Sequence, residues 1–170
     1  MNYSFDASNH APSFRPHFAG CVAKDARFAQ LLEEVYAEEL LSVAADTYRS
    51  LLLEAEGGRL SAIFDRFAME EIAHLRLVGE LCVALGRFPM LRAQIRIDPR
   101  RLGGDSAGIT GKTLEGMLAE ALRDEERSID RYQTLMGKTQ DRVARSTLAY
   151  LAEEEQRHAE ELESMLREIG

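Results

Sequence analysis

Two of the four histidines of this chain lie in the same short pattern, a glutamate followed three residues later by a histidine. The pairs are Glu71 with His74 and Glu155 with His158. Both lie in strongly helical sequence, where residues three apart share one face of a helix. One face that offers a carboxylate and an imidazole, supplied twice, is typical of ligands for a pair of metal ions.

Two further glutamates complete such a set. Each pair is preceded, about thirty residues upstream, by another helical stretch that carries a candidate carboxylate: Glu39 before Glu71, and Glu125 before Glu155. For the first stretch the neighbouring residue Glu38 competes with Glu39, because both have apolar residues one turn away. The repeated arrangement indicates two halves of similar design, each a glutamate helix followed by a Glu-x-x-His helix.

The surroundings of these glutamates favour metal binding over a solvated helix face. Glu71, Glu125 and Glu155 interrupt apolar stripes, with apolar or aromatic residues at most of the positions three, four and seven residues away. An unpaired carboxylate buried in such a stripe would cost several kcal/mol. Two divalent cations would compensate it. The alternative is exposed faces held together by local Glu–His pairs.

The elements that position these residues are four amphipathic helices, predicted over residues 25–56, 60–85, 112–136 and 139–168. Gly57 and Gly58 separate the first two, and Thr139 is a plausible N-cap for the last. Residues 1–24 read as an irregular N-terminal arm, and 87–111 as a long irregular crossover. The sequence thus predicts an all-α four-helix bundle domain over 25–170, two helical hairpins joined by the crossover, with the third helix running in the direction of the first.

Composition and charge narrow the class of protein. The formal net charge is −8 with no basic block, which argues against nucleic acid or an anionic membrane surface as partner. No apolar run is long enough to span a bilayer, and residues 1–20 lack the apolar core of a secretory signal. Two isolated cysteines, Cys21 and Cys82, form no disulfide framework, so we expect a cytoplasmic protein with Cys82 as a buried apolar residue.

The helical region resembles the ferritin-like superfamily, specifically the short rubrerythrin-like and manganese-catalase-like proteins. Four phrases over about residues 25–168 carry the resemblance: Glu39-Leu40-Leu41-Ser42 with Tyr48, Met69-Glu70-Glu71-Ile72-Ala73-His74-Leu75, Asp124-Glu125-Glu126-Arg127-Ser128-Ile129 with Tyr132, and Glu154-Glu155-Gln156-Arg157-His158. The resemblance implies a ferritin-like four-helix bundle and selects Glu39 over Glu38. The implied metal ligands are Glu39, Glu71, His74, Glu125, Glu155 and His158.

The same resemblance implies a function. Four carboxylates with two imidazoles and no thiolate suit iron or manganese, so we expect two Fe or two Mn ions per chain. By analogy Glu71 and Glu155 bridge them, while Asp46 and Tyr132 are candidates to orient the imidazoles. The implied substrates are hydrogen peroxide or dioxygen, turned over by a peroxidase or catalase that forms a homodimer.

Two departures from rubrerythrins keep alternatives open. The chain lacks the cysteines of a rubredoxin module, so a peroxidase would need a separate electron-donor protein. It also has Leu122 and Ser128 one turn from Glu125, where rubrerythrins carry an extra glutamate. A ferroxidase or iron-handling protein, and a non-catalytic metal-binding bundle, are the alternatives.

Overall fold

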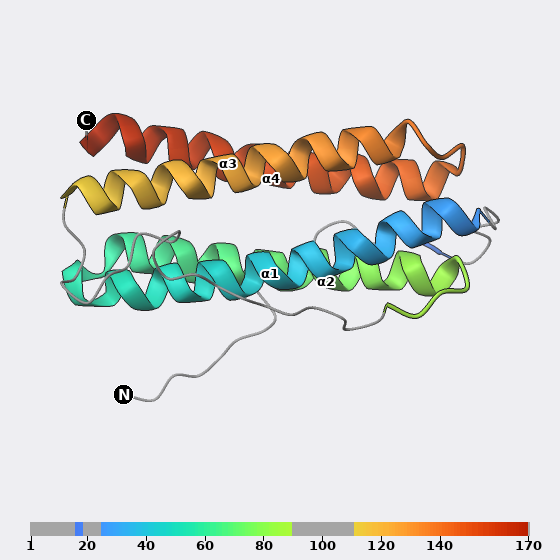
Figure 1. Ribbon diagram of the computed structural model, residues 1–170, viewed down its shortest axis with the longest axis horizontal. Coiled ribbons are helices and arrows are strands. Elements are labelled where there is room, and N and C mark those ends of the chain that lie inside the picture. The colour runs from blue at the N-terminus through green and yellow to red at the C-terminus, as the bar shows by residue number, and fades with distance from the viewer. Residues whose placement is uncertain (1–15, 19–24, 90–110, 170) are drawn as a thin grey trace.

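Four long helices make up the regular structure of this chain in the computed structural model, which describes residues 16–18, 25–89 and 111–169. They are α1 (Ala26–Gly57), α2 (Arg59–Ala84), α3 (Gly111–Met136) and α4 (Arg142–Ile169). They pack side by side as a four-helix bundle (Figure 1), which confirms the predicted all-α fold. Most of the predicted arm over 1–24 and of the crossover over 87–111 lies outside the described residues.

Local sequence sets the helix ends. The Asp25 carboxylate caps α1 by accepting hydrogen bonds from the backbone N–H groups of Arg27 and Phe28. Gly58, with a φ of 48°, joins α1 to α2 in a single residue, a backbone conformation that favours glycine. The prediction that α4 begins at Thr139 is wrong. Asp141 is the cap, because its carboxylate accepts the Ala144 N–H at 2.8 Å, and Thr139 accepts the N–H of Asp141 instead.

Antiparallel pairing relates every pair of adjacent helices, and it corrects the predicted direction of α3. Arg49 on α1 bonds to Asp124 on α3, whereas the earlier residue Glu38 pairs with the later residue Arg131. The helix α3 therefore runs opposite to α1, and α2 and α4 are opposed in the same way. The prediction failed because α3 begins at the end of the bundle opposite to that where α2 ends (Figure 1). A connection over 90–110 is long enough for this, since extended chain covers about 3.3 Å per residue.

The apolar core forms two clusters, and the carboxylates lie between them. One cluster holds Phe28, Leu32, Val35, Leu77, Leu81, Tyr132, Leu135, Leu148 and Leu151. The other holds Leu53, Phe64, Phe67, Met117, Leu118, Ala121, Leu162 and Met165. On each helix the predicted ligands fall between the stretches that enter the two clusters. Apolar packing on both sides thus fixes the helices around a polar centre.

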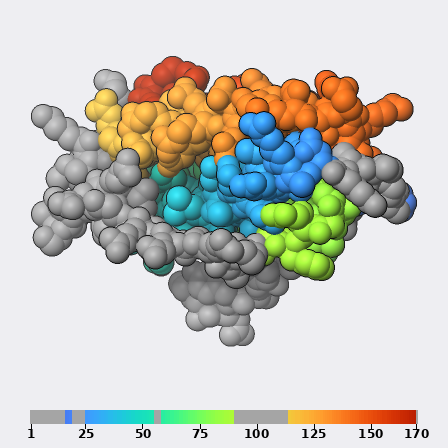
Figure 2. All heavy atoms as spheres, turned by 45° about the vertical axis from the view of Figure 1, so that its right-hand side comes forward, coloured from blue at the N-terminus to red at the C-terminus, as the bar shows by residue number. Residues whose placement is uncertain are grey.

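The seam between α1 and α3 contains a buried arginine. Arg49 is 1% exposed, and its guanidinium donates to Asp46 at 2.7 Å and to Asp124 at 2.5 Å. The two helices lie side by side on one face of the molecule, α1 in blue and cyan against α3 in orange (Figure 2). The Arg49 network therefore links the two hairpins through charge-assisted hydrogen bonds.

We expect Arg49→Met to destabilise the fold by about 3–5 kcal/mol, because it leaves the buried carboxylate of Asp46 without its cation. Urea unfolding at a fixed metal content measures the change. The control is Arg76→Met, which removes an exposed pair with Glu80 and should cost less than about 1 kcal/mol. Equal unfolding midpoints for the two variants would show that the Arg49 network contributes nothing to stability.

Candidate metal centre

All six predicted ligands come together at the middle of the bundle. Their side chains form two groups, each with ligand atoms within 4.8 Å of one another: Glu39, Glu71, His74 and Glu155, and Glu71, Glu125, Glu155 and His158. Every member is at most 5% exposed. Glu38 is not among them, because its side chain is half exposed and pairs with Arg131. Their action as ligands stays a prediction.

Glu71 and Glu155 belong to both groups. The imidazole Nδ1 of His74 lies 3.4 Å from Glu71 Oε2 and 3.2 Å from Glu155 Oε1. The Nδ1 of His158 lies 3.5 Å from Glu71 Oε1 and 3.1 Å from Glu155 Oε2. Each shared carboxylate thus turns one oxygen to each histidine. Either carboxylate could therefore be shared by two bound ions.

Glu39 and Glu125 each belong to one group. Glu39 Oε2 lies 3.9 Å from His74 Nδ1, and Glu125 Oε2 lies 3.8 Å from His158 Nδ1. The two imidazole rings are 5.9 Å apart between centroids. The centre therefore has one position with His74 and Glu39 and a second with His158 and Glu125, related by the repeat in the sequence.

The donor atoms fit a pair of metal ions. Glu39 Oε2, Glu71 Oε1, Glu155 Oε2 and the Nδ1 atoms of both histidines are buried without a hydrogen-bond partner among the described residues. Buried polar atoms are almost always paired, so a set of unpartnered acceptors gathered in one place is suited to hold a cation. Oxygen and imidazole donors without a thiolate are typical of iron or manganese.

The pKa values of the metal-free cluster also show that charge on its carboxylates is unfavourable. Burial, with repulsion from Glu71 and Glu155, raises the pKa of Glu39 well above its ordinary value. Burial does the same to the pKa of Glu125. Burial opposes charge on His74, but the carboxylates of Glu155 and Glu71 outweigh it and raise the pKa of His74 well above its usual value. Without metal, the centre retains protons.

Glu70 is a functional candidate that the sequence analysis missed. Its carboxylate lies 2.6 Å from Nε2 of His158, across from α2 to α4. A carboxylate accepts, so Nε2–H as donor leaves the Nδ1 lone pair facing the centre, and Glu70 thus favours the tautomer that could bind metal. Residue spacing within one helix cannot reveal a contact between helices. The equivalent residue of the other half, Glu154, pairs instead with Arg157, and His74 Nε2 is buried without a partner among the described residues.

Asp46 and Tyr132 were predicted to orient the imidazoles, and the structure gives them other partners. Tyr132, 1% exposed, donates its hydroxyl to Glu39 Oε1. Asp46, also 1% exposed, accepts from Arg49. Both residues lie on the inner face as the spacing indicated. The spacing could not show that their partners lie on a neighbouring helix or one turn further along the same helix.

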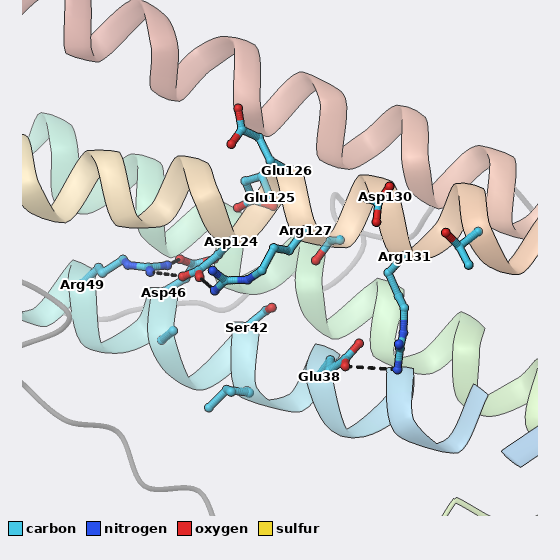
Figure 3. Close-up of a pocket in the computed structure, with 14 residues that line it drawn as sticks. Glu38, Ser42, Asp46, Arg49, Asp124, Glu125, Glu126, Arg127, Asp130 and Arg131 are labelled. Atoms are coloured by element: carbon cyan, nitrogen blue, oxygen red, sulfur yellow. Dashed lines mark hydrogen bonds and ion pairs between the residues drawn. The ribbon is translucent and has the colours of Figure 1, made fainter. Parts of the chain in front are cut away.

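A pocket of about 590 Å³ opens between α1 and α3 and reaches the centre at Glu125 (Figure 3). Its lining carries more carboxylates than guanidinium groups. The acidic residues are Glu38, Asp46, Asp124, Glu125, Glu126 and Asp130, and the basic ones are Arg49, Arg127 and Arg131.

Comparison with known proteins gives one family. Residues 28–170 match the family described as the ferritin-like domain. No curated protein matches the chain. In the described part of the chain, no helix has the length and low polarity that crossing a membrane requires.

We expect the metal-free protein to gain thermal stability as the pH falls from 7 to about 5.5. Glu39 and Glu125 have raised pKa values in the fold, so above about pH 4.5 the folded chain holds protons that the unfolded chain releases. Above about pH 6.5 the raised pKa of His74 acts in the same sense. Stability is lost as pH rises through the folded pKa values.

Thermal melting with and without chelator measures this effect. The metal-loaded protein is the control, and its stability should fall on acidification because protons compete with metal for the ligands. Identical melting curves for the two forms would contradict a buried metal centre.

We expect Glu70→Gln to weaken metal binding about 10- to 100-fold, because the amide no longer accepts strongly from His158 Nε2–H. The matched control is Glu154→Gln. It changes the same position of the other half, where the partner is exposed Arg157, and should leave affinity within about twofold. Competition titration of cobalt(II) against a chelator measures both, and equal affinities would remove Glu70 from the centre.

Proposed function

The chain belongs to the ferritin-like domain family, and on that premise we propose that it is a dinuclear iron or manganese oxidoreductase acting on hydrogen peroxide or dioxygen. The proposal rests on one observation above others, the two ligand groups that share Glu71 and Glu155. Glu71 and Glu155 would be shared by two bound ions, and Glu39 with His74 and Glu125 with His158 would complete the two positions. A bound pair supplies the electrons for O–O cleavage.

Side chains around the centre hold its predicted ligands in place. Tyr132 donates to Glu39, and burial raises the pKa of Tyr132 well above its usual value, so the hydroxyl keeps its proton at neutral pH. Phe67 stacks on the ring of His158, with centroids 4.3 Å apart. Glu70, one turn further along the same helix as Phe67, contacts Nε2 of that ring. Four carboxylates and two neutral imidazoles would balance the charge of two divalent ions.

Electron supply separates the two enzyme versions of the proposal. A catalase converts two peroxide molecules into dioxygen and two waters, and needs no donor. A peroxidase reduces one peroxide to two waters and needs two electrons and two protons from elsewhere. The described cysteine, Cys82, is buried, and burial raises the pKa of its thiol to about 12, so Cys82 does not serve as a redox thiol. A peroxidase cycle would draw on a separate electron-donor protein.

Iron handling is the second candidate, and the pocket beside Glu125 favours it. Carboxylates outnumber guanidinium groups there, which attracts cations toward the centre. In this version Fe(II) is the substrate, and dioxygen or peroxide oxidises it. Size-exclusion chromatography distinguishes a storage protein from the enzyme. A storage cage would have a far larger apparent mass than the homodimer that we expect.

We expect the wild type loaded with iron or manganese to hold two ions per chain and to consume hydrogen peroxide. Glu71→Ala should abolish peroxide consumption, because it removes a carboxylate that both positions share. The control is Glu153→Ala, an exposed residue two positions before Glu155 and rotated by about 200° from it, which should keep both properties.

Peroxide loss, oxygen release and metal content are measured together. Oxygen release without a reductant selects catalase, and loss only with a reductant selects peroxidase. If both metal forms leave peroxide untouched while Fe(II) is oxidised in air, the iron-handling candidate replaces the enzyme. A wild type that binds two ions and does neither would be a non-catalytic bundle.

A further inference from the structure

The two positions of the centre have the same ligand types but different surroundings. Asp46 lies seven residues after Glu39 on α1, and Tyr132 lies seven residues after Glu125 on α3. Ten residues after the same glutamates come Arg49 and Leu135. The charged residues Asp46 and Arg49 thus follow Glu39 in the sequence, where Tyr132 and Leu135 follow Glu125.

The position with Glu39 and His74 is closed by the apolar pair. Tyr132 and Leu135 are each 1% exposed and belong to the apolar cluster that also holds Leu32, Val35 and Leu148. The Tyr132 hydroxyl is bonded to Glu39. Movement of a molecule toward His74 from this side would have to displace packed side chains.

The position with Glu125 and His158 adjoins the pocket. Among the six predicted ligands, Glu125 is the one that lines it, together with Asp46 and Arg49. Arg49 Nε is buried and has no hydrogen-bond partner among the described residues. A buried donor without a partner beside a cavity suits a small anion or oxygen-containing ligand in that cavity.

Ion pairs and small side chains frame the pocket between α1 and α3. Ion pairs between α1 and α3 stand at its two ends, Arg49 with Asp124 at one and Arg131 with Glu38 at the other (Figure 3). Between them the lining includes three small residues, Ser42 and Ala45 on α1 and Ser128 on α3, beside the larger Leu41 and Arg127. Small side chains flanked by fixed ion pairs leave a window for ions and small molecules.

We propose that the centre is open at one end only. The position held by Glu125 and His158 exchanges its ion with solvent and receives small external ligands through the window between α1 and α3. The position held by Glu39 and His74 is closed and retains its ion. This inference rests on the proposed dinuclear centre. It adds the route by which ions and ligands reach the centre, and it assigns exchange to one position and retention to the other.

Cobalt(II) release tests the inference without reference to activity. Protein loaded with two cobalt ions per chain is mixed with excess EDTA, and cobalt loss is followed by absorbance. We expect two phases of one ion each, with rates at least 10-fold apart. Glu125→Ala should bind one ion and lack the fast phase, whereas Glu39→Ala should bind one ion and lack the slow phase.

Filling the window tests the route. Ser42→Trp should slow the fast phase at least 10-fold and weaken azide binding to the cobalt protein at least 10-fold, while two ions still bind at equilibrium. Ser128→Trp fills the same window from α3 and guards against a folding defect in the first variant. The control is Ser146→Trp, at an exposed position on α4, which should change neither property.

The outcomes separate this inference from the proposed function. A chain that binds no cobalt overturns both. Two bound ions that leave in a single phase, or tryptophan variants that fold and release cobalt and bind azide as the wild type does, overturn the one-ended centre and leave the dinuclear centre standing.

Discussion

Four carboxylates buried in the middle of an apolar bundle are the constraint on which the rest of this structure depends. Like charges at this spacing repel one another, and burial removes the water that would screen them. Two apolar clusters, one on each side of the centre, supply the packing that holds the helices together despite the repulsion. Along its inner face, each helix therefore carries apolar residues, then the predicted ligands, then apolar residues again.

The charged residues near the centre are paired with one another, which limits the cost of burying them. Arg49 brings a guanidinium into the interior and is bonded on both sides by carboxylates, so it adds little net positive charge of its own. Arg127 extends the network outward by pairing with Asp124. The seam between the hairpins is therefore polar where α1 meets α3. Between α2 and α4 the link is different, with Arg66 on Glu161 and Glu70 on His158.

The sequence predicted most of the features that depend on one helix at a time. Apolar periodicity placed the four helices, and burial of Glu71, Glu125 and Glu155 followed from their apolar neighbours at helical spacing. The preference for Glu39 over Glu38 needed a family resemblance, because both residues have apolar neighbours. Two failures lie within one helix, the cap of α4 at Asp141 and the pairing of Asp46 with Arg49. The others concern relations between helices: the direction of α3, the partner of Tyr132, and the reach of Glu70 to His158. Spacing along one chain segment carries no information about the segment that packs against it.

The two halves of the chain are alike in their predicted ligands and differ in the residues beyond them. The positions that follow Glu39 and Glu125 at the same spacing hold Asp46 and Arg49 in one half and Tyr132 and Leu135 in the other. A charged pair must reach partners on the neighbouring helix, which keeps that seam polar and the adjacent cavity open. An aromatic and an aliphatic residue pack into the core and exclude water. Identical ligands can therefore present two ions to different environments, and the residues one and two turns beyond the ligands set the difference.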